Sequence, residues 1–175
     1  MLLGSCVLFS LVGCFTFINL HLAAEPYHLS SSDLANIYMV YLIGMVITPL
    51  STQIIGRFGA KKTVLMAVSV SMVGVLGTLS TPLWGIVLAL AIMSTGVFIT
   101  QAATISYIAK NVTQNRSLAS GLYYMGYYTG GTIGATVCGL AYARGAWGMT
   151  VLTLLAVQVF ALLVASYIMV ARKAS

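Results

Sequence analysis

Neutral polar and aromatic side chains recur at helical spacing inside the long apolar runs of this sequence. Tyr38 and Tyr41 are three residues apart, Ser94 and Gln101 are seven apart, and each pair would share one face of a helix. Such groups can hold an uncharged or ring-bearing solute through hydrogen bonds and ring contacts. The candidate solute-cavity residues are Asn19, Tyr38, Tyr41, Ser94, Gln101, Tyr127 and Tyr128.

Two interpretations of these side chains stay open. Tyr127 and Tyr128 lie roughly 13–15 Å into their predicted helix at 1.5 Å per residue, too deep for the interfacial belt in which tyrosines are common. A polar group at that depth either faces a water-filled cavity or bonds to a neighbouring helix. We expect Tyr128 and Gln101 to face a solute cavity near the middle of the membrane.

Other chemistry is poorly supported by the sequence. Paired carboxylates, a Ser–His arrangement and a metal-ligand cluster are all missing from the apolar runs, so we expect neither an enzyme nor a cofactor. His21, Glu25 and His28 lie near one rim, but Pro26 interrupts their helical spacing, and no metal site is predicted. A proton relay would need a group from a partner half, because no carboxylate lies at mid-membrane in this sequence.

The composition fits a membrane protein. Eight Lys or Arg and two Asp or Glu make up 6% of the 175 residues, against about 25% in a soluble domain. Hydrophobic residues make up 60%, so the solvent for most side chains must be lipid. The net charge of +6 does not gather on one amphipathic face, and we expect no nucleic-acid partner.

Six apolar stretches of spanning length predict six transmembrane helices in one all-α domain, residues 1–175. Their limits carry helix-ending and helix-starting residues: Pro26 follows the first, Ser30 and Asp33 open the second, and Pro82 precedes the fourth. The predicted spans are residues 2–22, 34–55, 63–79, 83–107, 118–142 and 147–170.

The basic residues predict the orientation. Successive loops of a chain that crosses the membrane six times lie on alternating sides. Of the eight Lys and Arg residues, Arg144 alone then falls on the side that holds Glu25 and Asp33. The positive-inside rule then places both termini in the cytoplasm of a multi-pass protein of the cell inner (plasma) membrane. The residues assigned to the cytoplasmic side are Arg57, Lys61, Lys62, Lys110, Arg116, Arg172 and Lys173.

Small residues repeat along the fifth predicted span. Gly126, Gly130 and Gly134 are four residues apart and therefore lie on one helix face. A stripe of this kind lets two helix backbones approach closely in a membrane. We expect the stripe to pack against another helix.

The segment Gly56-Arg57-Phe58-Gly59-Ala60-Lys61-Lys62 resembles the loop motif of the major facilitator superfamily. The Arg, the second Gly and the trailing basic pair match. Thr52 replaces the leading Gly of the motif, and Gly56 replaces its Asp. The Gly-rich run from Tyr127 to Gly134 is similar to the eleventh helix of that family.

This resemblance implies the C-terminal half of a transporter, helices seven to twelve, similar to sugar- and drug-efflux members. It also implies a cytoplasmic gating loop, and plain anchoring of the topology is the alternative role. The loop residues are Gly56, Arg57, Gly59, Lys61 and Lys62.

The implied function is transport of a small solute by alternating access. The expected partners are the lipid bilayer, the solute and a second six-helix half, related to the first by an axis along the membrane normal. That second half is either an N-terminal half or another copy in the same orientation. A non-transporting scaffold or assembly protein, or an inactive truncated fragment, is the alternative.

Overall fold

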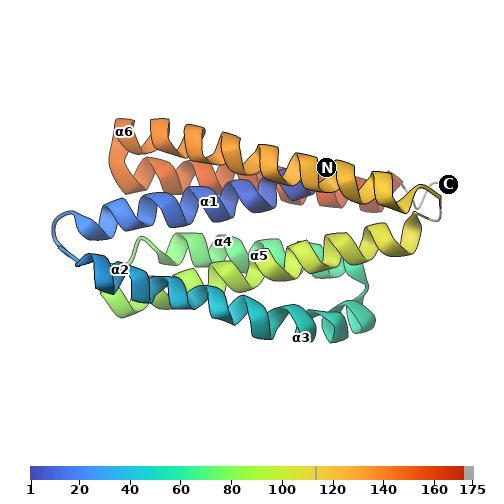
Figure 1. The fold of residues 1–175 in the computed structure, drawn as a ribbon, viewed down its shortest axis with the longest axis horizontal. Helices are drawn as coiled ribbons and strands as arrows, with labels where there is room; N and C mark the ends of the chain where they lie inside the picture. Colours follow the sequence, from blue (N-terminus) through green and yellow to red (C-terminus); the bar gives the residue numbers. More distant parts are fainter. Residues whose placement is uncertain (113, 172–175) are drawn as a thin grey trace.

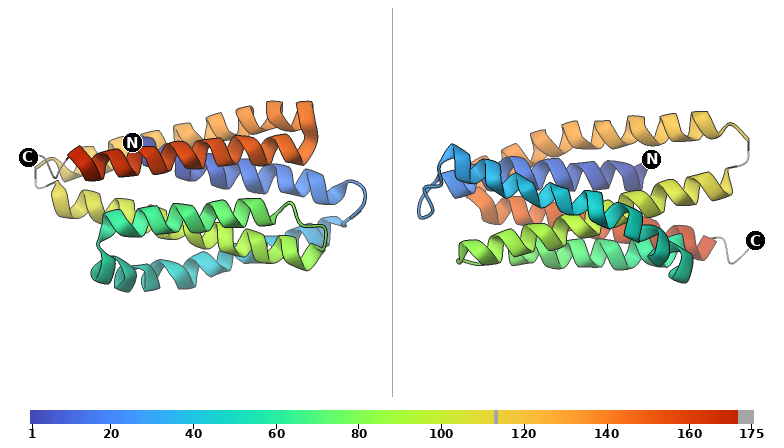
Figure 2. Two further views of the ribbon diagram at one scale, coloured as in Figure 1. Left: turned by 180° about the vertical axis from the view of Figure 1, so that it is seen from behind. Right: turned by 60° about the horizontal axis from the view of Figure 1, so that its bottom comes forward.

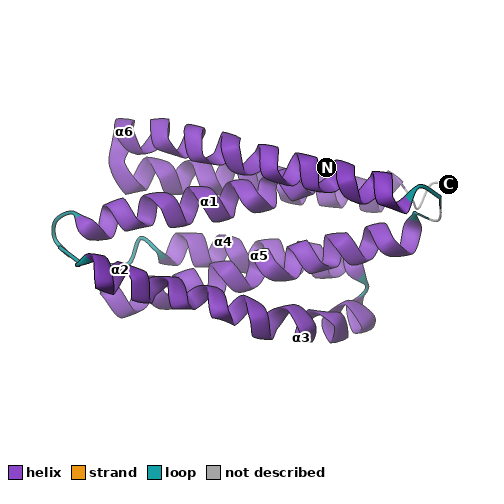
Figure 3. Ribbon diagram, viewed as in Figure 1, coloured by secondary structure: helices purple, strands orange, loops and turns teal. Residues whose placement is uncertain are grey.

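The described part of the chain folds into helices joined by short turns (Figure 3). The computed structural model describes residues 1–112 and 114–171, so Arg172 and Lys173 of the predicted cytoplasmic set lie outside the described residues. The elements are α1 (Leu2–Ala23), α2 (Ser31–Ile37), the 3₁₀ turn η1 (Tyr38–Tyr41), α3 (Leu42–Phe58), α4 (Ala60–Gly77), α5 (Leu83–Asn111) and α6 (Arg116–Ala171).

The described residues contain five helices long and apolar enough to cross a membrane, where the sequence predicted six. The difference lies in α6, which is 56 residues long. At 1.5 Å per residue that is about 84 Å, far more than the roughly 30 Å of a bilayer core. The backbone of α6 is non-helical at Gly145 and Ala146, where the chain folds back on itself (Figure 2). This break falls in the turn that the sequence predicted between its fifth and sixth spans.

Two other helices run past their predicted limits. The second begins at Ser31 and includes the 3₁₀ turn before continuing as α3 to Phe58. The fourth predicted helix, α5 in the structure, continues to Asn111, whose side-chain amide donates to the Tyr107 carbonyl at 2.8 Å. Hydropathy marks only the apolar part of a helix, whereas backbone hydrogen bonding continues into the polar ends.

Local chemistry explains where the second helix starts. Ser30 Oγ accepts a hydrogen bond from the Asp33 backbone N–H at 3.3 Å, and Asp33 Oδ2 accepts from the Ser30 N–H at 3.2 Å. This reciprocal capping box satisfies two backbone donors that a helix start leaves open. The structure confirms the start signal that the sequence predicted here.

The helices pack in two main pairs (Figures 1 and 2). The helix α1 lies mainly against α6, whereas α4 lies mainly against α5, with α3 also on α5. Gly130 of α6 lies against the backbone of Ser5, and a Cβ added at Gly134 would come within 2.7 Å of the Phe9 carbonyl oxygen. These contacts leave room only for glycine, so the α1–α6 pair is held backbone to backbone.

The connections alternate between the two ends of the bundle (Figure 1). One end holds the turn at Gly59 between α3 and α4, and the connection between α5 and α6. The opposite end holds the α1–α2 and α4–α5 connections and the fold-back within α6. The bundle therefore has one end rich in basic residues and one end that carries both acidic side chains.

Candidate functional site

Aromatic rings meet where α1 faces the 3₁₀ turn η1. The ring centroids of Tyr41 and Phe15 are 4.4 Å apart, and those of Tyr38 and Phe15 are 6.0 Å apart. Tyr38 and Tyr41 stack on each other at 5.8 Å with 9° between their planes. A 3₁₀ helix has three residues per turn, so side chains at i and i+3 align. The tight turn is thus what presents both tyrosines to α1.

Asn19 extends this group along α1. Its side-chain amide donates a hydrogen bond to the Tyr38 hydroxyl. Its carbonyl oxygen is buried and has no partner among the described residues. A buried amide oxygen without a partner is costly, so it can accept a hydrogen bond from water or from a solute hydroxyl.

A second group continues from Tyr41 across α5 to α6. The Phe98 ring lies 6.2 Å from that of Tyr41, and Gln101 follows Phe98 by three residues on the same helix. The Tyr127 hydroxyl donates to Gln101 Oε1 at 3.4 Å, beyond the usual range for O–H···O bonds. This loose bond is one that a solute can replace at little cost.

The tyrosines of α6 differ in exposure. Tyr127 is 8% exposed, whereas Tyr128 is 65% exposed, with its ring 5.5 Å from that of Tyr127. Tyr124 is stacked on Tyr128 at 6.5 Å. Tyr128 therefore presents a ring face and a hydroxyl at the surface of the bundle, next to the buried Tyr127 and its half-buried partner Gln101.

We call this continuous set the aromatic track. It links α1, η1, α5 and α6, and none of its members carries a charge. The aromatic track consists of Phe15, Asn19, Tyr38, Tyr41, Phe98, Gln101, Tyr127 and Tyr128.

Six of the seven candidate cavity residues named from the sequence belong to the track, and Ser94 does not. Ser94 is fully buried in α5, and its hydroxyl has no partner among the described residues. Phe15 and Phe98 were missed because apolar residues in an apolar run give no signal of their own. Their helical spacing was the available clue: Phe15 precedes Asn19 by four residues, and Phe98 precedes Gln101 by three.

A separate polar contact lies deep in the bundle. Gln158 of α6 donates through Nε2 to Ser71 Oγ of α4 at 2.9 Å, and both side chains are buried. Gln158 Oε1 and the Ser10 hydroxyl have no partners among the described residues, and both residues border one small cavity. This arrangement joins α4 and α6 through buried side chains.

The predicted gating loop forms the turn between α3 and α4. Gly59 has φ 78°, a left-handed value that suits glycine, and its N–H bonds to the Ile55 carbonyl at 2.9 Å. Arg57 lies over the Phe58 ring at 5.6 Å, and Lys61 lies over the Tyr107 ring at 5.9 Å. Gly56 has open space around its Cα. Lys61 and Lys62 line a groove that Lys110 of α5 also borders.

The long apolar helices carry uncharged polar side chains, and polar residues in membrane-spanning helices usually face the interior of the bundle or a water-filled cavity. Residues 1–175 match the sequence profile of the Major Facilitator Superfamily. The chain therefore belongs to this superfamily, which confirms the family resemblance seen in its loop and its Gly-rich helix.

The similar curated proteins are described as transporters. The chain is 27% identical over 146 residues to an uncharacterized MFS-type transporter, YybF, of Bacillus subtilis, covering 83% of the chain and 36% of that protein. It is 23% identical over 145 residues to an uncharacterized transporter of Buchnera aphidicola subsp. Baizongia pistaciae, with coverage of 83% and 36%. The chain thus spans about a third of the length of these relatives. No solved structure matches it.

Proposed function

We propose that the chain moves a small uncharged solute across the membrane by alternating access, as the C-terminal six-helix half of a major-facilitator transporter. Family membership supports transport, and the length of the relatives leaves room for a second half. The resemblance to sugar- and drug-efflux members favours export. The observation that carries the proposal is the aromatic track, which ends at the exposed Tyr128 ring.

The chemistry of the track favours particular solutes. Asn19 and Gln101 offer amide groups that both donate and accept hydrogen bonds, so they can orient a solute without selecting its charge. The tyrosine and phenylalanine rings favour solutes with apolar or aromatic faces. Without a carboxylate or a cation in the track, small ions would find no charged partner there.

The proposal also fixes a topology. The two arms of α6, on either side of Gly145 and Ala146, cross the membrane separately and give six spans. The basic end, with Arg57, Lys61 and Lys62, lies in the cytoplasm by the positive-inside rule. The alternation of the connections supports this assignment, because it gathers the described loop cations of α3, α4 and α5 at one end.

A solute-flux experiment separates transport from a scaffold role. The protein is purified from its own host membrane and screened with neutral sugars and neutral aromatic compounds for a rise in thermal stability. It is then reconstituted in proteoliposomes, and the flux of each stabilising compound is measured. We expect flux of at least one stabilising compound, reduced by Tyr127→Phe and unchanged by Tyr167→Phe. Tyr167 is the control because it carries the same side chain on α6 but lies outside the track, where it is 74% exposed. If compounds stabilise the protein but none of them crosses the membrane, the result would support a non-transporting scaffold instead.

A further inference from the structure

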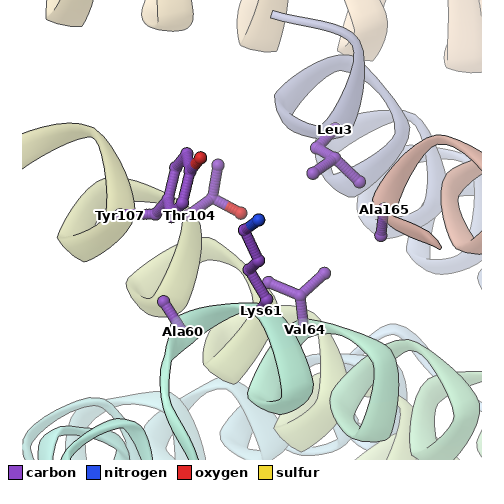
Figure 4. Close-up of a pocket in the computed structure, with 7 residues that line it drawn as sticks. All are labelled: Leu3, Ala60, Lys61, Val64, Thr104, Tyr107 and Ala165. Atoms are coloured by element: carbon purple, nitrogen blue, oxygen red, sulfur yellow. The ribbon is translucent and has the colours of Figure 1, made fainter. Parts of the chain in front are cut away.

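An apolar pocket with one cation lies at the basic end of the bundle (Figure 4). Its walls come from four helices, α1, α4, α5 and α6. In Figure 4 the Lys61 nitrogen points into the pocket, toward Thr104 and Tyr107. The lining residues are Leu3, Ala60, Lys61, Val64, Thr104, Tyr107 and Ala165.

The pocket continues into a basic groove. The groove shares Ala60, Lys61 and Tyr107 with the pocket and adds the side chains of Lys62 and Lys110. One continuous surface therefore carries three lysines at its outer part and aliphatic side chains farther in. This division into a cationic part and an apolar part matches an amphiphile with an anionic head.

The charge balance of the two ends favours an anionic ligand. The two acidic side chains of the chain, Glu25 and Asp33, belong to the α1–α2 connection and the first turn of α2, at the opposite end (Figure 1). The groove lies at the start of α4 and the end of α5, the level at which spanning helices reach the headgroups. The cytoplasmic leaflet is the one that carries anionic lipids, and basic pockets between helices on that side bind such headgroups.

We propose that this pocket and groove bind an anionic phospholipid of the cytoplasmic leaflet. The phosphate lies among Lys61, Lys62 and Lys110, and one acyl chain enters along Leu3 and Val64. The ammonium of Lys61 lies where the two parts meet, so it positions the phosphate at the mouth of the apolar pocket. The inference rests on the proposed membrane orientation and is independent of solute transport.

The test is lipid retention measured by native mass spectrometry. The protein is extracted from bilayers of equal parts phosphatidylglycerol and phosphatidylcholine, and the bound lipids are counted. We expect preferential retention of phosphatidylglycerol. Lys61→Ala should lower this retention roughly fivefold, the factor for one cation near an anionic surface. Lys61→Arg, which keeps the charge, should retain phosphatidylglycerol as the unmodified protein does. Arg144→Ala, which removes a loop cation at the opposite end, should leave the retention unchanged.

A second arm distinguishes a lipid from a free phosphate. Val64→Phe fills the apolar pocket without changing the charge, so it should reduce phosphatidylglycerol retention, while millimolar inorganic phosphate should not displace the lipid. Displacement by phosphate would show a simple anion site and would overturn the lipid assignment. Equal retention of both lipids, or equal loss in Lys61→Ala and Arg144→Ala, would also overturn it. Because no solute is used, a protein that fails the flux experiment still gives a clear result here.

Discussion

The first arm of α6, residues 116–144, has two unlike faces. On one face Gly126, Gly130 and Gly134 lie directly against α1, backbone to backbone. On the other face Tyr128 is 65% exposed and Tyr124 is 41% exposed. The glycine face leaves no side chain that could adjust, whereas the tyrosine face can change its contacts without unpacking the helix.

The two faces of this arm therefore differ in packing: one is held tightly against α1, and the other is exposed. Polar contacts elsewhere in the bundle follow the same division. The Gln158–Ser71 hydrogen bond is buried and short, at 2.9 Å. The Gln101–Tyr127 hydrogen bond is half-buried, lies next to the exposed Tyr128 and is long, at 3.4 Å. We therefore expect changes on the closed side to cost stability and changes on the open side to alter solute handling.

The largest expected effect is on the glycine face. Gly130→Ala forces a methyl group into the Ser5 backbone, and overpacking of this kind costs about 1–3 kcal/mol. Gly121→Ala is the matched control, because it lies on the same helix and a Cβ there would meet no atom of a neighbouring helix within 4 Å. Reversible unfolding in mixed micelles measures both variants. Equal unfolding free energies would show that the stripe does not hold α6 on α1.

A smaller effect is expected from the closed polar contact. A double-mutant cycle of Gln158→Leu and Ser71→Ala should give a coupling free energy between the membrane average of about 0.6 kcal/mol and its observed maximum of about 1.7 kcal/mol. The contact is fully buried and of good length, which places it in the upper part of that range. A coupling near zero would mean that the two side chains find equivalent partners when separated.

The open polar contact should couple less. The same kind of cycle on Gln101→Leu and Tyr127→Phe should give no more than about 0.6 kcal/mol, because the bond is long. The same variants should weaken solute binding, as measured by loss of solute-induced thermal stabilisation. If this coupling exceeded that of Gln158 and Ser71, the division into open and closed sides would be wrong.

The smallest effect on stability is expected at Tyr128. Tyr128→Phe removes an exposed hydroxyl that makes no hydrogen bond to another described residue, and surface changes of this kind stay within about 0.5 kcal/mol. Solute transport should nevertheless change, while Tyr167→Phe should alter neither property. A loss of stability in Tyr128→Phe alone would assign the hydroxyl to helix packing.

Some features could be predicted because they are local. The capping box at Ser30 and Asp33 and the break near Gly145 follow from residue type within a few positions. Other features depend on the partner helix. Gly74 of α4 lies against the backbone of Met93 of α5, and nothing in the sequence of α4 says which helix it meets.

The candidate site divides in the same way. Asn19, Gln101 and the tyrosines could be named from the sequence, because a polar group in an apolar run is conspicuous. The stacking of Tyr38 on Tyr41 could not be predicted, because it depends on a 3₁₀ turn inside an otherwise regular helical segment. Ser94 shares a helix face with Gln101 in sequence but is closed off by packing.

If Tyr128 lies in a solute cavity, the tyrosine face of α6 borders water rather than lipid, and cysteine labelling in intact membranes distinguishes the two. Tyr128→Cys and Leu163→Cys form a matched pair on α6, because the native side chains are 65% and 62% exposed. The native Cys6, Cys14 and Cys138 are buried, so the unmodified protein serves as the blank. We expect a small water-soluble thiol reagent to modify Tyr128→Cys and to leave Leu163→Cys unmodified. Equal labelling of the two, or labelling of Leu163→Cys alone, would contradict it.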